Sequence, residues 1–172
     1  MENNNIIQAT PIENEIEVFN DSVFIIEMDA DGHIVYANRR YLSLLDFTEE
    51  ELLGSSFHLI WHPDMPKGVL KAMWKIVTKG KIWRGYLKHL CKNGSYFWTL
   101  SYMHAKFDDE GNIIGYSSTG KVALKSSRKE VETKYQELID DIDHEYFMLS
   151  ENYYETQILP KAYYNEFPDE KN

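Results

Sequence analysis

The chain has 172 residues, of which 43% are hydrophobic and 14% aromatic, which is enough for one globular domain with extensions. Its formal net charge of −10 argues against nucleic acid or an anionic membrane surface as a partner. A single cysteine, no signal peptide and no apolar run near ~20 residues together predict a cytoplasmic protein without disulfides or direct membrane insertion.

The chain begins with a polar segment followed by two predicted strands. Residues 1–20 are predicted to form a flexible cap, with one helical turn near residues 14–19. Residues 23–29 and 33–38 have the β-branched content of strands, and the DADG sequence between them favours a tight turn.

Three helices are predicted next. Asn38 is a suitable N-cap for the first. In the second, Thr48 and Glu51 complete a capping box and Gly54 ends the helix. Pro66 suits the first turn of the third helix, and the apolar residues after it repeat at the spacing of one helical face.

The second half of the domain reads as three further strands. Residues 82–92 and 96–107 flank an Asn-Gly pair, a strong hairpin signal, and residues 113–124 form the last predicted strand. The element order predicts an α+β domain over residues 21–125, with a five-stranded antiparallel sheet and short helices inserted between strands two and three.

The pattern changes near residue 126. Apolar residues then recur at spacings typical of an amphipathic helix, predicted over residues 126–152 and interpreted as an interaction or dimerisation helix. Residues 153–172 are predicted to be an acidic tail. Residues 126–172 carry 5 basic and 12 acidic side chains, so most of the net charge lies in this extension.

The sequence WHPDMP places an indole, an imidazole and a carboxylate at the start of the third helix. These groups can form a cofactor wall, in which Trp61 stacks on a flat ring while His62 and Asp64 bind its polar edges. Alternatively, Asp64 caps the helix and His62 satisfies a backbone group, and the residues alone favour this second interpretation.

Other aromatic and polar residues leave the chemistry open. Trp74 is either a core residue or a cofactor contact, and His89, on the same strand face as Trp83, is either a ligand-binding group or a half-exposed strand residue. The histidines show no zinc motif, so no metal site is predicted, and a haem ligand would be His58 or His62. No catalytic motif is present, so the chain is not predicted to be an enzyme.

The motifs DADGHIVYAN, LLDFTEEELLG, HPDMP, MWKIVTKG, KNGSYFW and DDEGNIIGYSSTGK resemble, in order and spacing, a PAS domain. More narrowly, they resemble the sensor PAS domain of bacterial aerotaxis and energy-taxis receptors, over about residues 23–124. The resemblance implies a non-covalently bound FAD whose redox state reports oxygen or electron-transport status. The positions that it implies for cofactor binding are Asn38, Trp61, His62, Asp64, Trp74, Trp83 and His89.

Two of these positions depart from the family pattern. Trp61 stands where the family usually has Arg, and His89 stands where it usually has Asn. An imidazole titrates near neutrality, unlike an amide, so His89 is expected to make the redox behaviour of a bound flavin sensitive to pH.

The sequence therefore predicts a cytoplasmic, FAD-binding redox or oxygen sensor. It would signal to a membrane chemoreceptor through its sheet and C-terminal helix, with a homodimer as a further association. The alternatives are a haem-binding gas sensor and a cofactor-free PAS interaction module.

Overall fold

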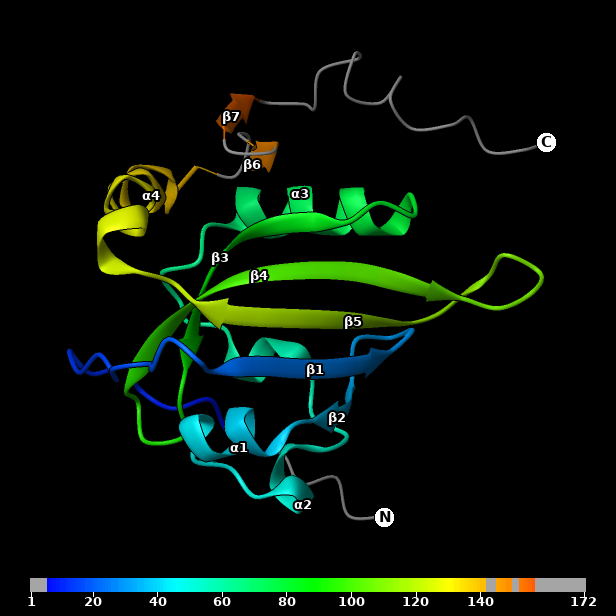
Figure 1. Cartoon of the computed structure of the whole chain (residues 1–172), viewed down its shortest axis with the longest axis horizontal. Helices are drawn as coiled ribbons and strands as arrows, with labels where there is room; N and C mark the ends of the chain where they lie inside the picture. The colour runs from blue at the N-terminus through cyan, green and yellow to red at the C-terminus, as the bar shows by residue number, and fades with distance from the viewer. Residues whose placement is uncertain (1–5, 142–144, 150–151, 157–172) are drawn as a thin grey trace.

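A five-stranded antiparallel sheet forms the centre of the computed structural model, which describes residues 6–141, 145–149 and 152–156 (Figure 1). Its strands are β1 (Val23–Asp29), β2 (Ile34–Ala37), β3 (Trp83–Leu90), β4 (Tyr96–Phe107) and β5 (Ile113–Val122), in the order β2-β1-β5-β4-β3. Inserted between β2 and β3 are α1 (Arg39–Leu45), α2 (Glu49–Leu52), the 3-10 helix η1 (Phe57–Ile60) and α3 (Lys67–Thr78). The predicted α+β fold is confirmed.

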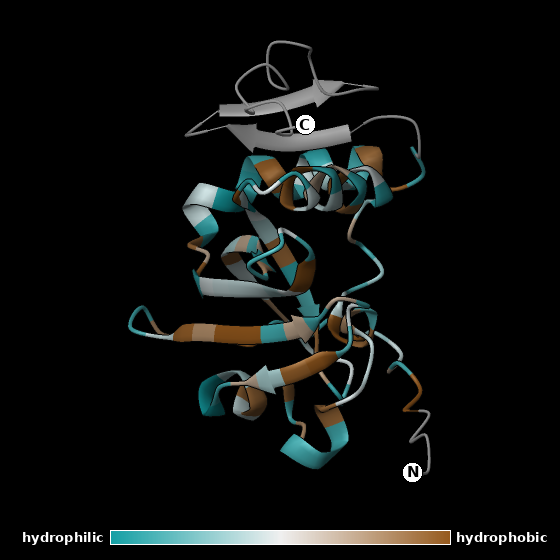
Figure 2. Ribbon diagram, turned by 90° about the vertical axis from the view of Figure 1, so that its right-hand side faces the viewer, coloured by the Kyte–Doolittle hydropathy of each residue, from teal (hydrophilic) through white to brown (hydrophobic). Residues whose placement is uncertain are grey.

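The two faces of the sheet have different covers, because side chains alternate between them along each strand. On the inner face, which packs against α1 and α3, Phe24 and Ile26 of β1 are fully buried. The outer face carries Tyr86 and Trp98 and is partly covered by helix α4 (Lys125–Leu138). Figure 2 shows hydrophobic residues in parts of the strands and along the helices, and hydrophilic residues at several turns.

The predicted helix caps are present. The Asn38 side chain accepts the N–H groups of Tyr41 and Ile25, so it both starts α1 and ties it to β1. Thr48 and Glu51 form the expected capping box at the start of α2. These local bonds fix where the inserted helices begin.

The N-terminal segment is extended, so the helical turn predicted near residues 14–19 is wrong. The Ile16 N–H donates to the Tyr96 carbonyl at 2.7 Å, which places the segment alongside the start of β4. At the β3–β4 turn, a Cβ on Gly94 would lie 2.3 Å from the Thr10 carbonyl oxygen. The extended form is preferred because its backbone groups find partners on the sheet.

The C-terminal helix is present but shorter than the predicted range 126–152. After α4, strands β6 (Glu145–Leu149) and β7 (Asn152–Thr156) form a separate antiparallel pair. Asp140 and Asp141 are unfavourable at the C-terminal end of a helix, and the aromatic residues further on favour strands. The predicted tail beyond residue 156 lies outside the described residues. None of the described helices is long and apolar enough to cross a membrane.

Helix α4 is joined to both the N-terminal segment and the sheet. Arg128, which is 3% exposed, pairs with Glu15 of the N-terminal segment and with Glu132 of its own helix. The buried hydroxyl of Tyr135 donates to the carbonyl of Tyr86 on β3 at 2.9 Å. A nearly buried guanidinium without such partners would be strongly destabilising, so these contacts hold the three segments together.

Replacing Tyr135 by Phe is expected to lower the free energy of unfolding by about 1 kcal/mol, because it removes one buried hydrogen bond. Urea denaturation measures this change, and amide hydrogen exchange in α4 should accelerate. Tyr36→Phe, at a position 44% exposed, is the matched control and should change stability by less than ~0.5 kcal/mol. Equal effects of the two substitutions would contradict the anchoring role of Tyr135.

Candidate functional site

The WHPDMP corner runs along the edge of β3. Trp61 and His89 form a single antiparallel bridge, and the His62 N–H donates to the Lys88 carbonyl at 3.0 Å. Successive side chains on an extended segment point to opposite sides. The Trp61 ring therefore lies on the inner side of the sheet, and the His62 ring lies on the outer side.

On the outer side, His62 and Asp64 are engaged with β3. The Asp64 carboxylate binds Lys88 Nζ at 2.6 Å, and the His62 Nδ1 accepts the Asp64 N–H at 3.1 Å. Burial and the Lys88 charge lower the pKa of His62. The predicted backbone role of His62 is thus confirmed. Capping of α3 by Asp64 is wrong, because Pro66 occupies the N-cap without a side-chain bond and the carboxylate is turned to Lys88.

On the inner side, a chain of hydrogen bonds passes through His89. Its Nδ1 lies 2.9 Å from the Tyr41 hydroxyl, its Nε2 lies 2.8 Å from Thr99 Oγ1, and Thr99 Oγ1 lies 2.7 Å from Ser101 Oγ. The His89 ring also stacks on Phe97 with a centroid distance of 5.0 Å. Buried polar groups need such partners, and hydroxyls can serve either nitrogen of a neutral imidazole.

His89 is held in its neutral form. Burial lowers its pKa to about 3, and its two partners are hydroxyls that bring no negative charge to stabilise an imidazolium. The expectation that His89 titrates near neutrality is therefore wrong.

A row of small residues lies on the inner face, beside the hydrogen bonds of His89. Gly85, Ser101 and Gly120 are direct neighbours across β3, β4 and β5. A Cβ on Gly85 would lie 2.3 Å from the Trp83 ring, so a glycine two residues after Trp83 allows that ring to lie over the strand. Glycines inside strands commonly mark such close approaches. At Gly85 the approaching group is the Trp83 ring, and Gly120 presents no side chain beside Ser101.

Two buried indole N–H groups lack an acceptor. Trp61 and Trp83 are 4% and 2% exposed, and neither Nε1 has a hydrogen-bond partner in the part of the chain that the structure describes. The Trp61 ring packs against Phe57 and Trp74, with centroid distances of 4.8 and 6.3 Å. A buried donor without an acceptor costs about 1–3 kcal/mol, so both groups are well suited to a ligand that supplies one.

The predicted site residues fall into two groups. Four lie on the inner side: Trp61, Trp74, Trp83 and His89. The other three lie elsewhere. Asn38 caps α1, and His62 and Asp64 lie on the outer side of β3.

Sequence reasoning missed the hydroxyl partners of His89. Thr99 and Ser101 occupy alternate, inward-facing positions of a strand whose neighbours are apolar, and this pattern was a readable signal. Tyr41 could not be found in this way, because its bond to His89 joins residues 48 positions apart.

Gln8 was also missed, and it braces the corner from the N-terminal segment. Its Nε2 donates to the carbonyls of His58 and Trp61 at 3.1 and 2.7 Å. Carbonyls at the end of a helix lack partners within the helix, so Gln8 supplies bonds that η1 cannot. No local sequence pattern marks this role.

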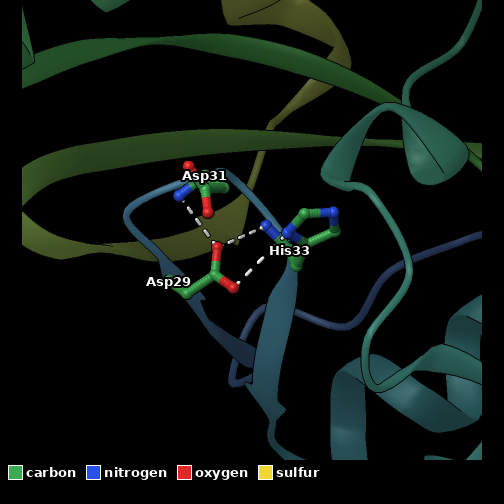
Figure 3. A group of neighbouring side chains, drawn as sticks. All are labelled: Asp29, Asp31 and His33. Atoms are coloured by element: carbon green, nitrogen blue, oxygen red, sulfur yellow. Dashed lines mark hydrogen bonds and ion pairs between the residues drawn. The ribbon is translucent and has the colours of Figure 1, made fainter. Parts of the chain in front are cut away.

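Asp29, Asp31 and His33 meet at the β1–β2 turn (Figure 3). Asp29 Oδ1 accepts the N–H groups of Asp31 and His33 at 2.9 Å each, and Asp29 Oδ2 lies 3.4 Å from His33 Nδ1. These bonds are those of an Asx turn, which accounts for the arrangement without a cation. No metal site is assigned to this cluster.

A family model described as the PAS fold matches residues 34–119. The chain therefore belongs to the PAS family, as its motifs and the observed sheet with inserted helices lead one to expect.

Two characterised relatives illustrate the range of this similarity. The aerotaxis receptor of Escherichia coli (strain K12) is 31% identical over 118 residues, which cover 69% of this chain and 23% of that receptor. The biofilm dispersion protein BdlA of Pseudomonas aeruginosa is 20% identical over 133 residues, covering 75% of this chain and 32% of that protein. The chain thus spans less than a third of either relative.

Among solved structures, the LOV domain of the blue-light photoreceptor Aureochrome1 in its dark state resembles this chain. It has a TM-score of 0.58 and 24% identity, and the match covers 64% of this chain and 83% of that domain. At this identity the likeness establishes the shared fold.

A buried neutral His89 makes the stability depend on pH. An unfolded histidine has a pKa near 6.5, whereas His89 in the folded state has a pKa of about 3. Between these pH values only the unfolded state binds the proton, so the free energy of unfolding falls as pH decreases, by up to about 1.4 kcal/mol per pH unit.

In His89→Gln this contribution should disappear, which flattens the decline in stability between about pH 6 and pH 4. Urea denaturation at a series of pH values measures the slope. His104→Gln, at an exposed position of β4, is the control and should keep the wild-type slope. The same slope in His89→Gln as in wild type would contradict the assignment.

Proposed function

We propose that this PAS domain is the sensory unit of an energy-taxis type of signalling system. It holds FAD non-covalently between the inner face of the sheet and helices α1 and α3. The observation that carries the proposal is the pair of buried, unpaired indole N–H groups of Trp61 and Trp83 beside the row of small residues. The 31% identity with the aerotaxis receptor supports the same functional class.

The inner face has the chemistry that a flavin requires. A flavin is flat and carries carbonyl oxygens and ring nitrogens on its edge, so it can accept hydrogen bonds from the Trp61 and Trp83 indoles. Gly120 has no side chain and so allows close approach to β5, and the hydroxyl of Ser101 beside it can donate or accept. Small-molecule sites commonly combine such apolar walls with a few converging polar groups.

A bound flavin would supply reversible uptake of electrons and protons. The contribution of the protein is a set of hydrogen bonds that can reverse direction. The hydroxyls of Thr99 and Ser101 can rotate, and neutral His89 can exchange its donor and acceptor nitrogens between Tyr41 and Thr99. If the bound flavin changed from accepting to donating a hydrogen bond on the inner face, the series of hydrogen bonds from Tyr41 of α1 through His89 of β3 to Thr99 and Ser101 of β4 would therefore reorganise.

The remaining predicted site residues have a positioning role in this proposal. Asn38 fixes α1, and with it Tyr41, against the sheet. His62 and Asp64 hold the corner to the outer side of β3, through the Lys88 carbonyl and ammonium groups. The direct contacts are then Trp61, Trp74, Trp83 and His89.

The output surface in this proposal is the outer face with α4 and the N-terminal segment. Helix α4 contacts β3 through Tyr135 and the N-terminal segment through Arg128. A cytoplasmic signalling domain of a chemoreceptor, or a second copy of this chain, would bind this surface and respond to a change in the position of α4.

An absorbance spectrum tests the cofactor. Protein purified from cells, and again after incubation with FAD and removal of the excess, is expected to show the blue and near-ultraviolet absorption bands of a flavin. A Soret band would favour the haem alternative and overturn the flavin. A spectrum without visible bands in both samples would favour a cofactor-free interaction module.

Gly120→Val is expected to weaken flavin binding at least about tenfold, because its side chain would cover the row of small residues. A Cβ at this position already lies 3.1 Å from Ser101 Oγ and 3.2 Å from the Cβ of Thr99. FAD at about 100 times its Kd should raise the stability of wild type by about 2.7 kcal/mol, and of Gly120→Val by much less. Thermal unfolding with and without FAD measures both.

Ser117→Val is the matched control, since it adds the same side chain on the outer face of the same strand. It should keep the full stabilisation by FAD. If Gly120→Val folds, as judged by circular dichroism, and gains as much from FAD as wild type, the flavin does not lie over the row of small residues.

A further inference from the structure

The charges of this chain are separated along its length. Residues 65–107, which run from just before α3 to the end of β4, hold eight lysines and one arginine but no aspartate or glutamate. Residues 139–172, which follow α4, hold nine acidic and two basic side chains. A chain with a net charge of −10 therefore contains a segment with a net charge of +9.

Four of these lysines form a row on α3, which we call the lysine row: Lys67, Lys71, Lys75 and Lys79. They recur every four residues and so share one side of the helix, over a length of about 18 Å at 1.5 Å per residue. Three of the four are exposed and Lys75 is half-buried, whereas the apolar side of α3 is buried in the core. The row is thus a continuous basic surface on one side of α3.

Like charges at this spacing weaken a helix. Two lysines four residues apart repel each other, and Lys67 adds a cation at the N-terminal end of α3, where the helix dipole favours an anion. Other cations of residues 65–107 have carboxylate partners, as in the pair of Lys92 with Glu51 at 2.6 Å. A carboxylate-rich neighbour along the lysine row would remove this repulsion and stabilise α3.

An acidic segment of the same chain begins close to the row. Strand β6 lies against both α3 and β3, so the chain returns to this helix soon after α4 ends (Figure 1). Residues 139–172 have a net charge of −7, opposite in sign to that of the row. The position of β6 and the charge of its segment therefore point to the same contact.

We propose that the lysine row is the docking site of this chain's own C-terminal segment, residues 139–172. The contact is held by ion pairs between exposed groups, so salt weakens it and a competing acidic chain can displace it. It joins the C-terminal segment to the helix that carries Trp74, in addition to the contacts that α4 makes with the sheet. The inference does not depend on the proposed cofactor.

Carbodiimide crosslinking of the full chain tests this docking, because the reagent joins a lysine to a carboxylate only where the two touch. Peptide mass spectrometry is expected to show links from the lysine row to residues 139–172 at low salt, and at least about threefold fewer at about 1 M salt. The link between Lys92 and Glu51 is the internal control at low salt. A sample that gives this control link and none from the row would overturn the proposal.

Lys71→Gln combined with Lys75→Gln removes two charges from the middle of the row. Links from the two remaining lysines of the row to residues 139–172 should fall at least about threefold, because fewer ion pairs hold the segment. Lys121→Gln combined with Lys129→Gln is the matched control, since it removes two exposed charges elsewhere, and should leave these links unchanged. Equal yields in the two double variants would overturn the role of the row.

A mixture of isotopically labelled and unlabelled chains shows which copy supplies the carboxylate. Docking within one chain is expected to give links between peptides of the same label only. Links that join a labelled to an unlabelled peptide in the proportion expected for random mixing would assign the contact to two copies of the chain and overturn docking within one.

Discussion

The pairing of the WHPDMP corner with the edge of β3 is the interaction on which the site depends. Because Trp61 bridges His89 and the next residue binds the Lys88 carbonyl, the two adjacent rings are forced to opposite sides of the sheet. The inner side receives a buried indole beside a neutral imidazole. The outer side receives the polar pair formed by Asp64 and Lys88. The WHPDMP segment thus covers the inner side of the sheet with Trp61 and is held to the outer side by the Asp64–Lys88 ion pair.

The N-terminal segment joins this corner to α4. Gln8 binds the Trp61 carbonyl, and seven residues later in the same extended segment Glu15 binds Arg128 of α4. Between them the segment is fixed to the β3–β4 turn and to Tyr96. A displacement of the WHPDMP corner would therefore move α4, because the N-terminal segment that joins them is short, extended and bonded at both ends. A ligand that binds two positions of the corner with different affinities would shift α4 through this connection.

Local signals predicted the fold well, and the site only in part. The capping box at Thr48 and the Asn-Gly turn before Ser95 specify their elements through nearby atoms, so the sequence was sufficient for them. The helix beyond residue 138 was wrongly predicted because apolar spacing continues into residues whose charge and aromatic content favour another structure. The pKa of His89 was misjudged for a different reason. It depends on complete burial, which a strand pattern does not reveal.

Asp64 illustrates the same limit at a single residue. Its position before a helix made it a reasonable cap, but the carboxylate bound an ammonium group 24 residues away. Local capping motifs compete with charged partners brought by the fold, and a charge-assisted bond at 2.6 Å is among the stronger polar contacts. Gln8 and Tyr41 gain their roles in the same way, through partners that only the tertiary structure brings close.

Trp61 now defines how this site would hold an anionic cofactor. An arginine there, as in the family pattern, would contribute a cation able to bind phosphate. Trp61 instead contributes a buried neutral donor and a ring that packs against Trp74, which in turn packs edge-to-face on Tyr116. Recognition at this end of the site would then rest on stacking and on hydrogen bonds to neutral rings. An indole at this position, together with the aromatic rings of Trp74 and Tyr116, would therefore hold the ligand without a cation.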